Sequence, residues 1–275
     1  MLVYLPSALS HTPLDVIHST VYHRVSRWMD KLHSGHCPID EASKYERCEV
    51  WSGSRRFHFF LDPNDNIIPQ PFRRGAFWEA WMHGHFRRYA NTSATAVDVG
   101  ANVGAHTVML STLFGEVHAF EMQRGVQRML RKNVASNSAP GRVHLHHFAL
   151  GATDGSNGHY CDLPGRYRNR GGMAASQGRG PRKKGCQQIH FRTLDSVLGQ
   201  LDRPLALMKV DVEGFEESVL LGSRRLIARH RPVIFFESFA LSQKQNLTRM
   251  LAELDYDTHV LNYPHDYIAL PRRAR

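Results

Sequence analysis

The chain lacks the features that would place it in a membrane or a secretory pathway. No stretch of its 275 residues reaches the roughly 18 consecutive apolar residues that a spanning helix needs. Its start, Met1 to Ser10, has no basic region and meets Pro6 early, so it makes a poor signal peptide. These absences predict a soluble protein.

Cysteine is scarce, and its spacing matches no common cysteine motif. The four cysteines (Cys37, Cys48, Cys161 and Cys186) lie far apart in the sequence and form no C-x-x-C pair. We therefore expect neither a disulfide framework nor a zinc ribbon. The same reasoning predicts a reducing compartment, the cytoplasm.

Acidic residues are missing from one segment of an otherwise mixed chain. Between Leu163 and Leu194 there are eight Arg or Lys and no Asp or Glu, and removing these eight charges from the total of +10 leaves +2 for the rest. The basic character therefore belongs to this segment rather than to a general nucleic-acid-binding surface. Because the segment is also rich in glycine, we expect a flexible basic insertion over about 163–190.

Hydrophobic residues, at 42% of the chain, are sufficient for a packed core. Apolar residues from Leu14 to Leu32 recur at helical spacing, which predicts an N-terminal helical addition over 1–55. Its His33, His36 and Cys37 are not expected to bind a metal. A second helix is expected over 75–89, with Glu79 and His83 one turn apart and facing a cleft. From Thr95 onwards strands and helices alternate, so 56–275 should be one α/β domain with a doubly wound, mostly parallel sheet.

The stretch from Thr95 to Ser111 reads as a buried strand, a glycine turn and a helix in immediate succession. Glycine permits close approach of a ligand to the backbone, and the N–H groups that begin a helix favour electron-rich groups. The spacing is D-x-G-x-x-x-G, so the dinucleotide fingerprint is not met. The next apolar run ends in Glu121, where a carboxylate can accept hydrogen bonds from both hydroxyls of a ribose. The pattern predicts a nucleotide-containing cofactor.

The motif V-D-V-G-A-N-V-G with the later A-F-E resembles the S-adenosylmethionine (SAM) site of class I methyltransferases. The blocks L-M-K-V-D-V-E-G-F-E-E-S-V-L-L-G-S and R-P-V-I-F-F-E resemble the FkbM family within that class, and the resemblance covers about residues 57–271. It departs from the family where Met122 replaces a usual proline. The resemblance implies a seven-stranded Rossmann-like sheet with SAM as cofactor. It also implies cofactor-binding roles for Asp98, Gly100, Ala101, Asn102, Gly104, Glu121, Phe148 and Ala149.

Methyl transfer to a hydroxyl needs an acceptor held in line with the methyl group and a general base for its proton. The candidates lie at the ends of two later strands: Lys209, Asp211, Glu213 and Glu237. Their alternative role is a structural ion pair, and the same carboxylates have the right oxygens for a divalent cation, although their spacing is not diagnostic. Another metal candidate is the group His144, His146 and His147. Alternation along a strand puts His147 on the opposite face, so we predict no metal there.

These features predict a SAM-dependent O-methyltransferase of the FkbM type. The resemblance implies hydroxyl acceptors on sugars, glycans or natural products, and the basic insertion makes an anionic acceptor one of the expectations. An RNA 2′-O-methyltransferase, which would hold phosphates with the basic insertion, ranks second. A binding module that keeps the fold without catalysis is the third hypothesis, against which the intact motifs argue.

Overall fold

The structure is a computed structural model that describes residues 37–42, 44–161, 175–178, 180, 185–262 and 265–272. The predicted N-terminal helix lies outside the described residues. So does most of the basic insertion. Of the eight basic residues between Leu163 and Leu194, only Arg192, just beyond the insertion, falls within the described ranges.

A central sheet of seven strands organises the molecule, in the order β13-β14-β12-β11-β4-β5-β6. Five neighbouring strands are parallel, whereas β14 runs antiparallel to β12 and forms a hairpin with β13. This sheet confirms the predicted doubly wound architecture. The strands are β4 (Asn91–Val99), β5 (Phe114–Phe120), β6 (Val143–His146), β11 (Leu205–Val210), β12 (Val233–Glu237), β13 (Tyr256–Asn262) and β14 (Asp266–Pro271).

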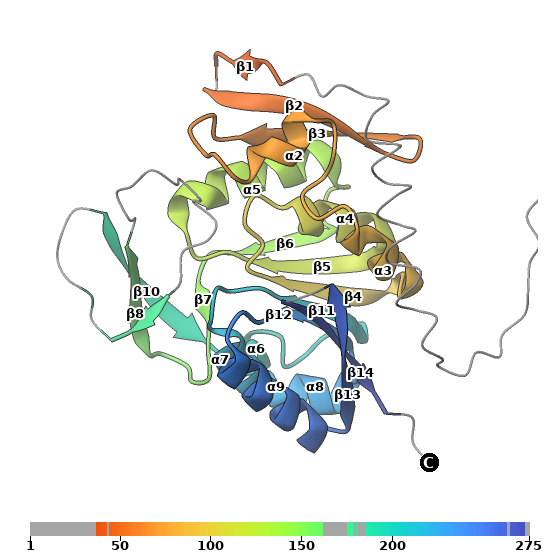
Figure 1. The fold of residues 1–275 in the computed structure, drawn as a ribbon, viewed down its shortest axis with the longest axis vertical. Helices are drawn as coiled ribbons and strands as arrows, with labels where there is room; N and C mark the ends of the chain where they lie inside the picture. Colours follow the sequence, from red (N-terminus) through yellow and green to blue (C-terminus); the bar gives the residue numbers. More distant parts are fainter. Residues whose placement is uncertain are drawn as a thin grey trace, which may run out of the picture.

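Helices cover both faces of the central sheet, which is why its inner strands are apolar on both sides. Leu207 packs in the same cluster as Val108, while its neighbour Met208 packs with Leu226 on the opposite face. Figure 1 shows α4 and α5 on one side and α7, α8 and α9 on the other. The helices are α2 (Pro69–Arg73), α3 (Met82–Arg88), α4 (Ala105–Leu113), α5 (Arg124–Asn137), α6 (Leu194–Val197), α7 (Glu216–Leu221), α8 (Arg224–His230) and α9 (Leu241–Glu253).

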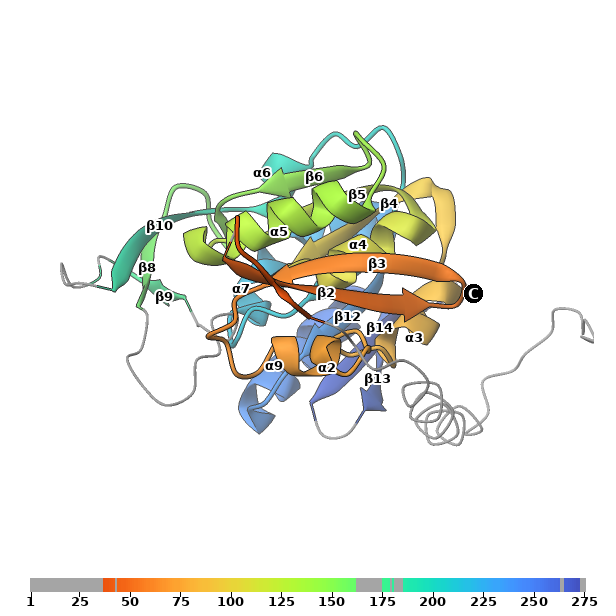
Figure 2. The same ribbon diagram turned by 90° about the horizontal axis from the view of Figure 1, so that it is seen from above.

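A three-stranded antiparallel sheet of β1 (Ile39–Asp40), β2 (Tyr45–Ser52) and β3 (Arg55–Leu61) packs over α5 (Figure 2). The Asn133 side chain of α5 accepts a hydrogen bond from the Phe60 backbone N–H at 2.6 Å and donates one to its carbonyl at 3.2 Å. The predicted domain boundary at residue 55 falls at the first residue of β3, within this sheet. Residues 45–52 are therefore a strand of this sheet rather than part of a helical addition.

Two expectations about secondary structure are wrong. The helix predicted over 75–89 begins only at Met82, because Glu79 has a left-handed backbone conformation (φ 46°) that cannot continue a helix. The glycine-rich segment is not all loop: β9 and most of β10 lie within it and join β7 and β8 in a small sheet of the order β7-β10-β8-β9. These strands are β7 (Ala149–Leu150), β8 (Asn157–Cys161), β9 (Ser176–Gln177) and β10 (Cys186–Arg192). Their pairing is non-local, so local composition gave no sign of it.

All four cysteines are paired, so the expectation of no disulfides is also wrong. Cys37 bonds Cys48, and Cys161 bonds Cys186. The second bond joins residues directly opposite each other in the antiparallel pair β8–β10, a neighbourhood created only by strand pairing. The cytoplasmic location stays a prediction, but unpaired cysteines no longer support it. In the part of the chain that the structure describes, no helix is long and apolar enough to cross a membrane.

Replacing Cys161 and Cys186 together with serine should destabilise the fold. The disulfide closes a separation of 25 residues, and a loop of this size is expected to contribute about 3 kcal/mol to the free energy of unfolding. Urea unfolding of the double variant and the parent protein measures the difference. Thiol titration of the parent protein in denaturant without reductant is the control. No reactive thiol is expected, and four reactive thiols would show that the two disulfides do not form.

Candidate active site

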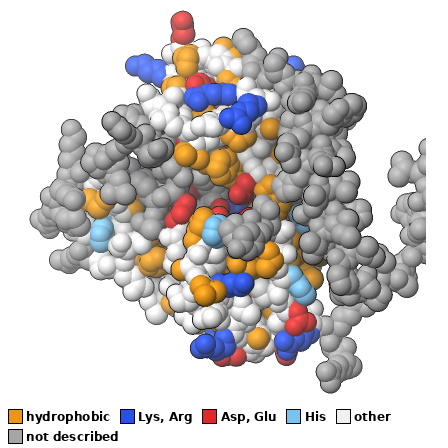
Figure 3. Space-filling view, viewed as in Figure 1, with side chains coloured by type: hydrophobic (Ala, Val, Ile, Leu, Met, Phe, Trp, Pro, Cys, Tyr) orange, Lys and Arg blue, Asp and Glu red, His pale blue; other side chains and the backbone are white. Residues whose placement is uncertain are grey.

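A cavity of about 280 Å³ opens at the carboxyl ends of β4, β5, β11 and β12. Figure 3 shows this hollow, with acidic side chains inside and hydrophobic side chains around it. Parallel sheets bind ligands at this edge. Of the predicted site residues, those that line the cavity are Gly100, Asn102, Glu121, Phe148, Ala149, Asp211, Glu213 and Glu237. The others, Asp98, Ala101, Gly104 and Lys209, are buried behind its wall.

The glycine turn after β4 is packed tightly against the end of β11. The N–H groups of Gly100 and Ala101 both donate to the Phe120 carbonyl, at 3.0 and 2.9 Å. Gly100 has φ +79°, and a Cβ there would lie 1.8 Å from the Asp211 carbonyl oxygen. Only glycine fits this position, and its small size brings the predicted cofactor turn and the predicted catalytic loop together.

Asp98 has a positioning role in the structure rather than a place in the cavity wall. Its side chain is fully buried, accepts a hydrogen bond from the Thr107 hydroxyl of α4 at 2.5 Å, and lies 3.8 Å from Lys209 Nζ. Burial raises the pKa of Asp98 above its ordinary value, against the opposing effect of Lys209. The carboxyl group thus joins the end of β4 to both α4 and β11.

Glu121 presents a carboxyl group to the cavity at the end of β5. Its two oxygens accept hydrogen bonds from the backbone N–H groups of Asn102 and Gln123, at 2.9 and 2.7 Å. Burial raises the pKa of Glu121 to about 7 despite these bonds. Beside it, Asn102 Oδ1 is buried and has no hydrogen-bond partner among the described residues. Each carboxylate oxygen has further acceptor capacity, so this corner suits a ligand that brings hydroxyl groups.

An apolar wall stands beside Glu121. Phe120 and Phe148 meet edge to face with ring centroids 5.7 Å apart, and Phe191 stacks on Phe215 at 5.2 Å. All four side chains line the cavity. A corner with hydroxyl acceptors next to an aromatic wall fits the ribose and the flat base of a nucleoside. The residues present therefore fit a nucleoside-type cofactor.

The opposite part of the cavity is built around Lys209, which β11 carries into a group of carboxyls. Its ammonium group is buried and donates to Asp211 Oδ2 at 2.9 Å. Burial alone would lower the pKa of Lys209, but Asp211, Asp98 and Glu79 outweigh it and raise the pKa above its ordinary value. Lys209 thus remains charged and holds Asp211 at the cavity edge.

Two neighbouring carboxyls retain their protons at neutral pH. Burial and the charge of Asp211 raise the pKa of Glu237 to about 9, and Glu237 is also hydrogen-bonded to Asp211. The same two causes raise the pKa of Glu79 to about 8. Protonated Glu237 therefore acts as the donor to Asp211, and the two groups share one proton. Glu213, whose pKa burial also raises, lines the cavity just beyond them.

Glu79 was absent from the set of predicted catalytic residues, although its place before the first core strand had suggested that it faces the cleft. It does line the cavity, and its Oε2 lies 3.5 Å from His106 Nε2. His83, predicted to face the cleft with it, instead packs edge to face on Phe77 behind the wall. Burial lowers the pKa of His83 to about 3, so it stays neutral.

A match to a known sequence family identifies the chain. The family described as the methyltransferase FkbM domain matches residues 98–263, which is more than half of the chain. The chain belongs to the FkbM methyltransferase family. The match contains both the glycine turn and the Lys209–Asp211 loop, whereas Glu79 of the cavity wall lies before it. No curated protein matches the chain.

Solved structures with a similar fold include the FkbM methyltransferase of Methylobacillus flagellatus KT, at 19% identity and a TM-score of 0.46. That similarity covers 65% of this chain and 43% of the other, so the present chain corresponds to less than half of that protein. A Streptococcus mutans protein solved with SAH is similar at 12% identity and a TM-score of 0.43, over 68% of this chain and 93% of the other. An rRNA methylase of Streptococcus thermophilus is similar at 12% identity and a TM-score of 0.42, over 69% of this chain and 93% of the other.

The raised pKa values of this FkbM methyltransferase predict a pH-dependent stability. Glu237 has a pKa of about 9 in the folded protein and an ordinary value of 4.5, so the folded state retains a proton that the unfolded state loses. Its contribution to stability is full below about pH 4.5 and is lost as the pH rises towards 9. The thermal midpoint of the parent should fall over this range. The thermal midpoint of Glu237→Gln should fall less over the same range, because glutamine does not titrate.

The matched control is Glu253→Gln, which changes an exposed glutamate of α9. Its thermal midpoints at pH 5, 7 and 9 should follow those of the parent. An unchanged pH slope in Glu237→Gln would contradict the shared proton.

Proposed function

We propose that this chain is a SAM-dependent O-methyltransferase that acts on a hydroxyl group of a sugar, a glycan or a small natural product. The observation that carries the proposal is that one cavity joins two features. One is a corner that accepts hydroxyl groups, at Glu121 and Asn102, and the other is the Asp211 carboxyl group, which the buried Lys209 holds. The first suits a cofactor with a ribose, and the second suits removal of a proton from an alcohol.

In this proposal the cofactor lies between the glycine turn and the aromatic wall. Glu121 accepts hydrogen bonds from the ribose hydroxyls, and Phe120 and Phe148 provide the apolar surface for the base. When bound, SAM supplies the methyl group as a sulfonium. Asp98, Ala101 and Gly104 contribute from behind the wall: they hold the turn in shape and fix its distance from β11.

Asp211 is the proposed general base. It lies at the cavity edge and Lys209 stabilises its negative charge, whereas Glu79 and Glu237 are protonated at neutral pH. A proton taken from an acceptor hydroxyl by Asp211 leaves two neutral carboxyl groups, Asp211 and Glu237, and Asp211 then releases the proton to water. Glu213, on the loop beyond, is placed to contact the acceptor. The loop itself is held by Glu216, whose Oε1 accepts from the N–H groups of Val212 and Gly214 at 3.0 and 3.1 Å.

The class of acceptor separates this proposal from its alternatives. An RNA acceptor would use the basic insertion, just beyond which Arg192 lies 5.4 Å from the Phe148 ring. Methyl transfer from labelled SAM to a panel of glycans, small alcohols and RNA tests the proposal directly. Label appearing in an ether of a sugar or alcohol is expected. Label in RNA alone would support the RNA 2′-O-methyltransferase, and SAM binding without any transfer would support a non-catalytic module.

Changing Glu121 to alanine should weaken cofactor binding. Loss of hydrogen bonds to a charged partner costs about 1.5–3 kcal/mol, which is roughly a ten- to hundred-fold loss in affinity. Calorimetry with SAM measures it. Glu253→Ala, far from the cavity wall, is the control and should bind as the parent does. Unchanged affinity in Glu121→Ala would remove the ribose assignment.

Changing Asp211 to asparagine should lower turnover by about 10²–10⁴-fold with little effect on SAM affinity, because the general base is lost while the side chain keeps its size. Glu237→Gln retains a donor to Asp211, whereas Glu237→Ala does not, so the glutamine variant should be the more active of the two. Single-turnover rates at saturating SAM measure both effects. Near-parental turnover in Asp211→Asn would move the base to another carboxyl.

A further inference from the structure

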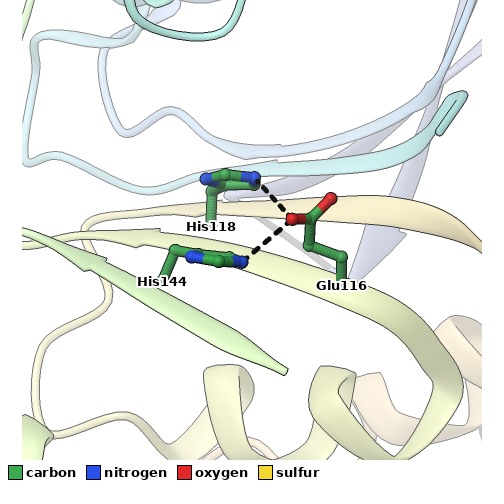
Figure 4. A group of neighbouring side chains, drawn as sticks. All are labelled: Glu116, His118 and His144. Atoms are coloured by element: carbon green, nitrogen blue, oxygen red, sulfur yellow. Dashed lines mark ion pairs between the residues drawn. The ribbon is translucent and has the colours of Figure 1, made fainter. Parts of the chain in front are cut away.

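We propose that Glu116, His118 and His144 form a binding site for one divalent transition-metal ion, for which zinc is the best match. The three side chains project from one face of β5 and β6, as Figure 4 shows. One ligand atom from each lies within 4.8 Å of the other two. None of the three residues lines the active-site cavity, so the site is separate from the chemistry described above.

Strand register creates this group. His118 of β5 is the direct partner of His144 of β6, so their side chains leave the sheet side by side on the same face. Glu116 lies two residues before His118, and alternation along a strand places it on that face as well. The two imidazole rings are stacked with centroids 4.8 Å apart, which is the ordinary spacing of neighbouring strands.

The distances among the three groups suit a small metal ion. Glu116 Oε1 lies 2.9 Å from His144 Nε2 and 3.6 Å from His118 Nε2. Ligands about 2 Å from a tetrahedral zinc ion lie roughly 3.3 Å from one another, a value between these two distances. Two imidazole nitrogens and one carboxylate oxygen, with water in the fourth position, form a set that zinc accepts. Magnesium and calcium prefer oxygen ligands alone.

A second observation points to a ligand. The His118 side chain is nine-tenths buried, and its Nε2 atom has no hydrogen-bond partner among the described residues. The other ring nitrogen, Nδ1, is hydrogen-bonded to His146 Nε2 at 3.0 Å. In the tautomer whose Nδ1 donates to His146 Nε2, the Nε2 atom carries the lone pair and faces Glu116 Oε1.

The carboxylate is oriented from outside the site. Thr95 of β4 donates its hydroxyl hydrogen to Glu116 Oε2 at 3.1 Å, which directs Oε1 towards the two histidines. Such bonds to the outer atoms of metal ligands are a regular feature of metal sites. Because β6 is the edge strand, a metal ion held between β5 and β6 would pin the edge of the sheet.

The interpretation of His144, His146 and His147 from the sequence considered the ligands of one strand alone. The structure brings His144 together with two residues of the neighbouring strand. His147, by contrast, lies 3.2 Å from Arg131 and outside the group. It therefore provides a matched control, since it is a histidine of the same segment without a place in the site.

The experiment uses the full chain without an affinity tag, freed of metal by a chelator and then dialysed. Cobalt(II) is titrated into the protein while its visible d–d absorption is recorded, and zinc affinity is measured by competition with a chromogenic chelator. We compare the parent with His144→Ala, Glu116→Ala and His147→Ala. His144 is the most exposed of the three ligands, at 44% of its side chain, so its replacement should leave the fold intact. Thermal unfolding of the metal-free proteins verifies this.

The parent and His147→Ala should each show tetrahedral cobalt absorption and a zinc-dependent rise in thermal midpoint. His144→Ala and Glu116→Ala should lose the absorption, and their zinc affinity should fall by more than about 100-fold, since even outer contacts to metal ligands are worth 10- to 100-fold. Weaker binding by other histidines would persist equally in all four proteins. Parental cobalt spectra in both ligand variants, or a parent that binds neither ion, would overturn the proposal and leave a hydrogen-bonded His–Glu cluster only.

Discussion

The buried ammonium group of Lys209 is the interaction on which the arrangement of the active site depends. It lies among carboxyls from three directions: Asp98 at the end of β4, Asp211 after β11, and Glu79 from the segment before α3. Removing such a cation would leave buried like charges facing one another, which is strongly destabilising. Lys209 therefore does two things at once: it allows acidic side chains to gather at one edge of the sheet, and it holds the Asp211 carboxyl group at the cavity edge.

The arrangement around Lys209 also depends on close backbone packing at the ends of β4 and β11. Gly100 lets the turn after β4 meet the Asp211 carbonyl, and Glu216 holds the loop beyond β11 through two backbone N–H groups. Glu237 and Glu79 would be ionised at neutral pH if they were exposed to water, but burial raises the pKa of both groups and keeps them protonated. Perturbed groups of this kind, gathered in one cavity, are typical of catalytic sites. The group of Glu116, His118 and His144 depends instead on the register of β5 and β6, and none of its residues lines the cavity.

The small sheet formed by β7 to β10 contributes a wall to the cavity. Phe191 of β10 stacks on Phe215, and Ala149 and Leu150 of β7 line the hollow. The disulfide between Cys161 and Cys186 ties β8 to β10 at the far end of this sheet. The segment read from the sequence as a flexible insertion includes β9 and most of β10, and its Ala175 lines the cavity.

The sequence by itself determined the alternation of strands and helices in the central sheet from Thr95 onwards, the glycine turn and the acidic residues at strand ends. These are local patterns: a buried strand, a turn that needs glycine and an amphipathic helix each depend on neighbours in the chain. The carboxyl-end rule for parallel sheets then placed Glu121, Asp211 and Glu237 at one edge. Only the tertiary structure decided which of them face the cavity, since Asp98 and Lys209 turned inward while Glu79 joined from a distant segment. It alone also paired the cysteines and set His118 opposite His144, because strand register brings together residues that no local pattern relates.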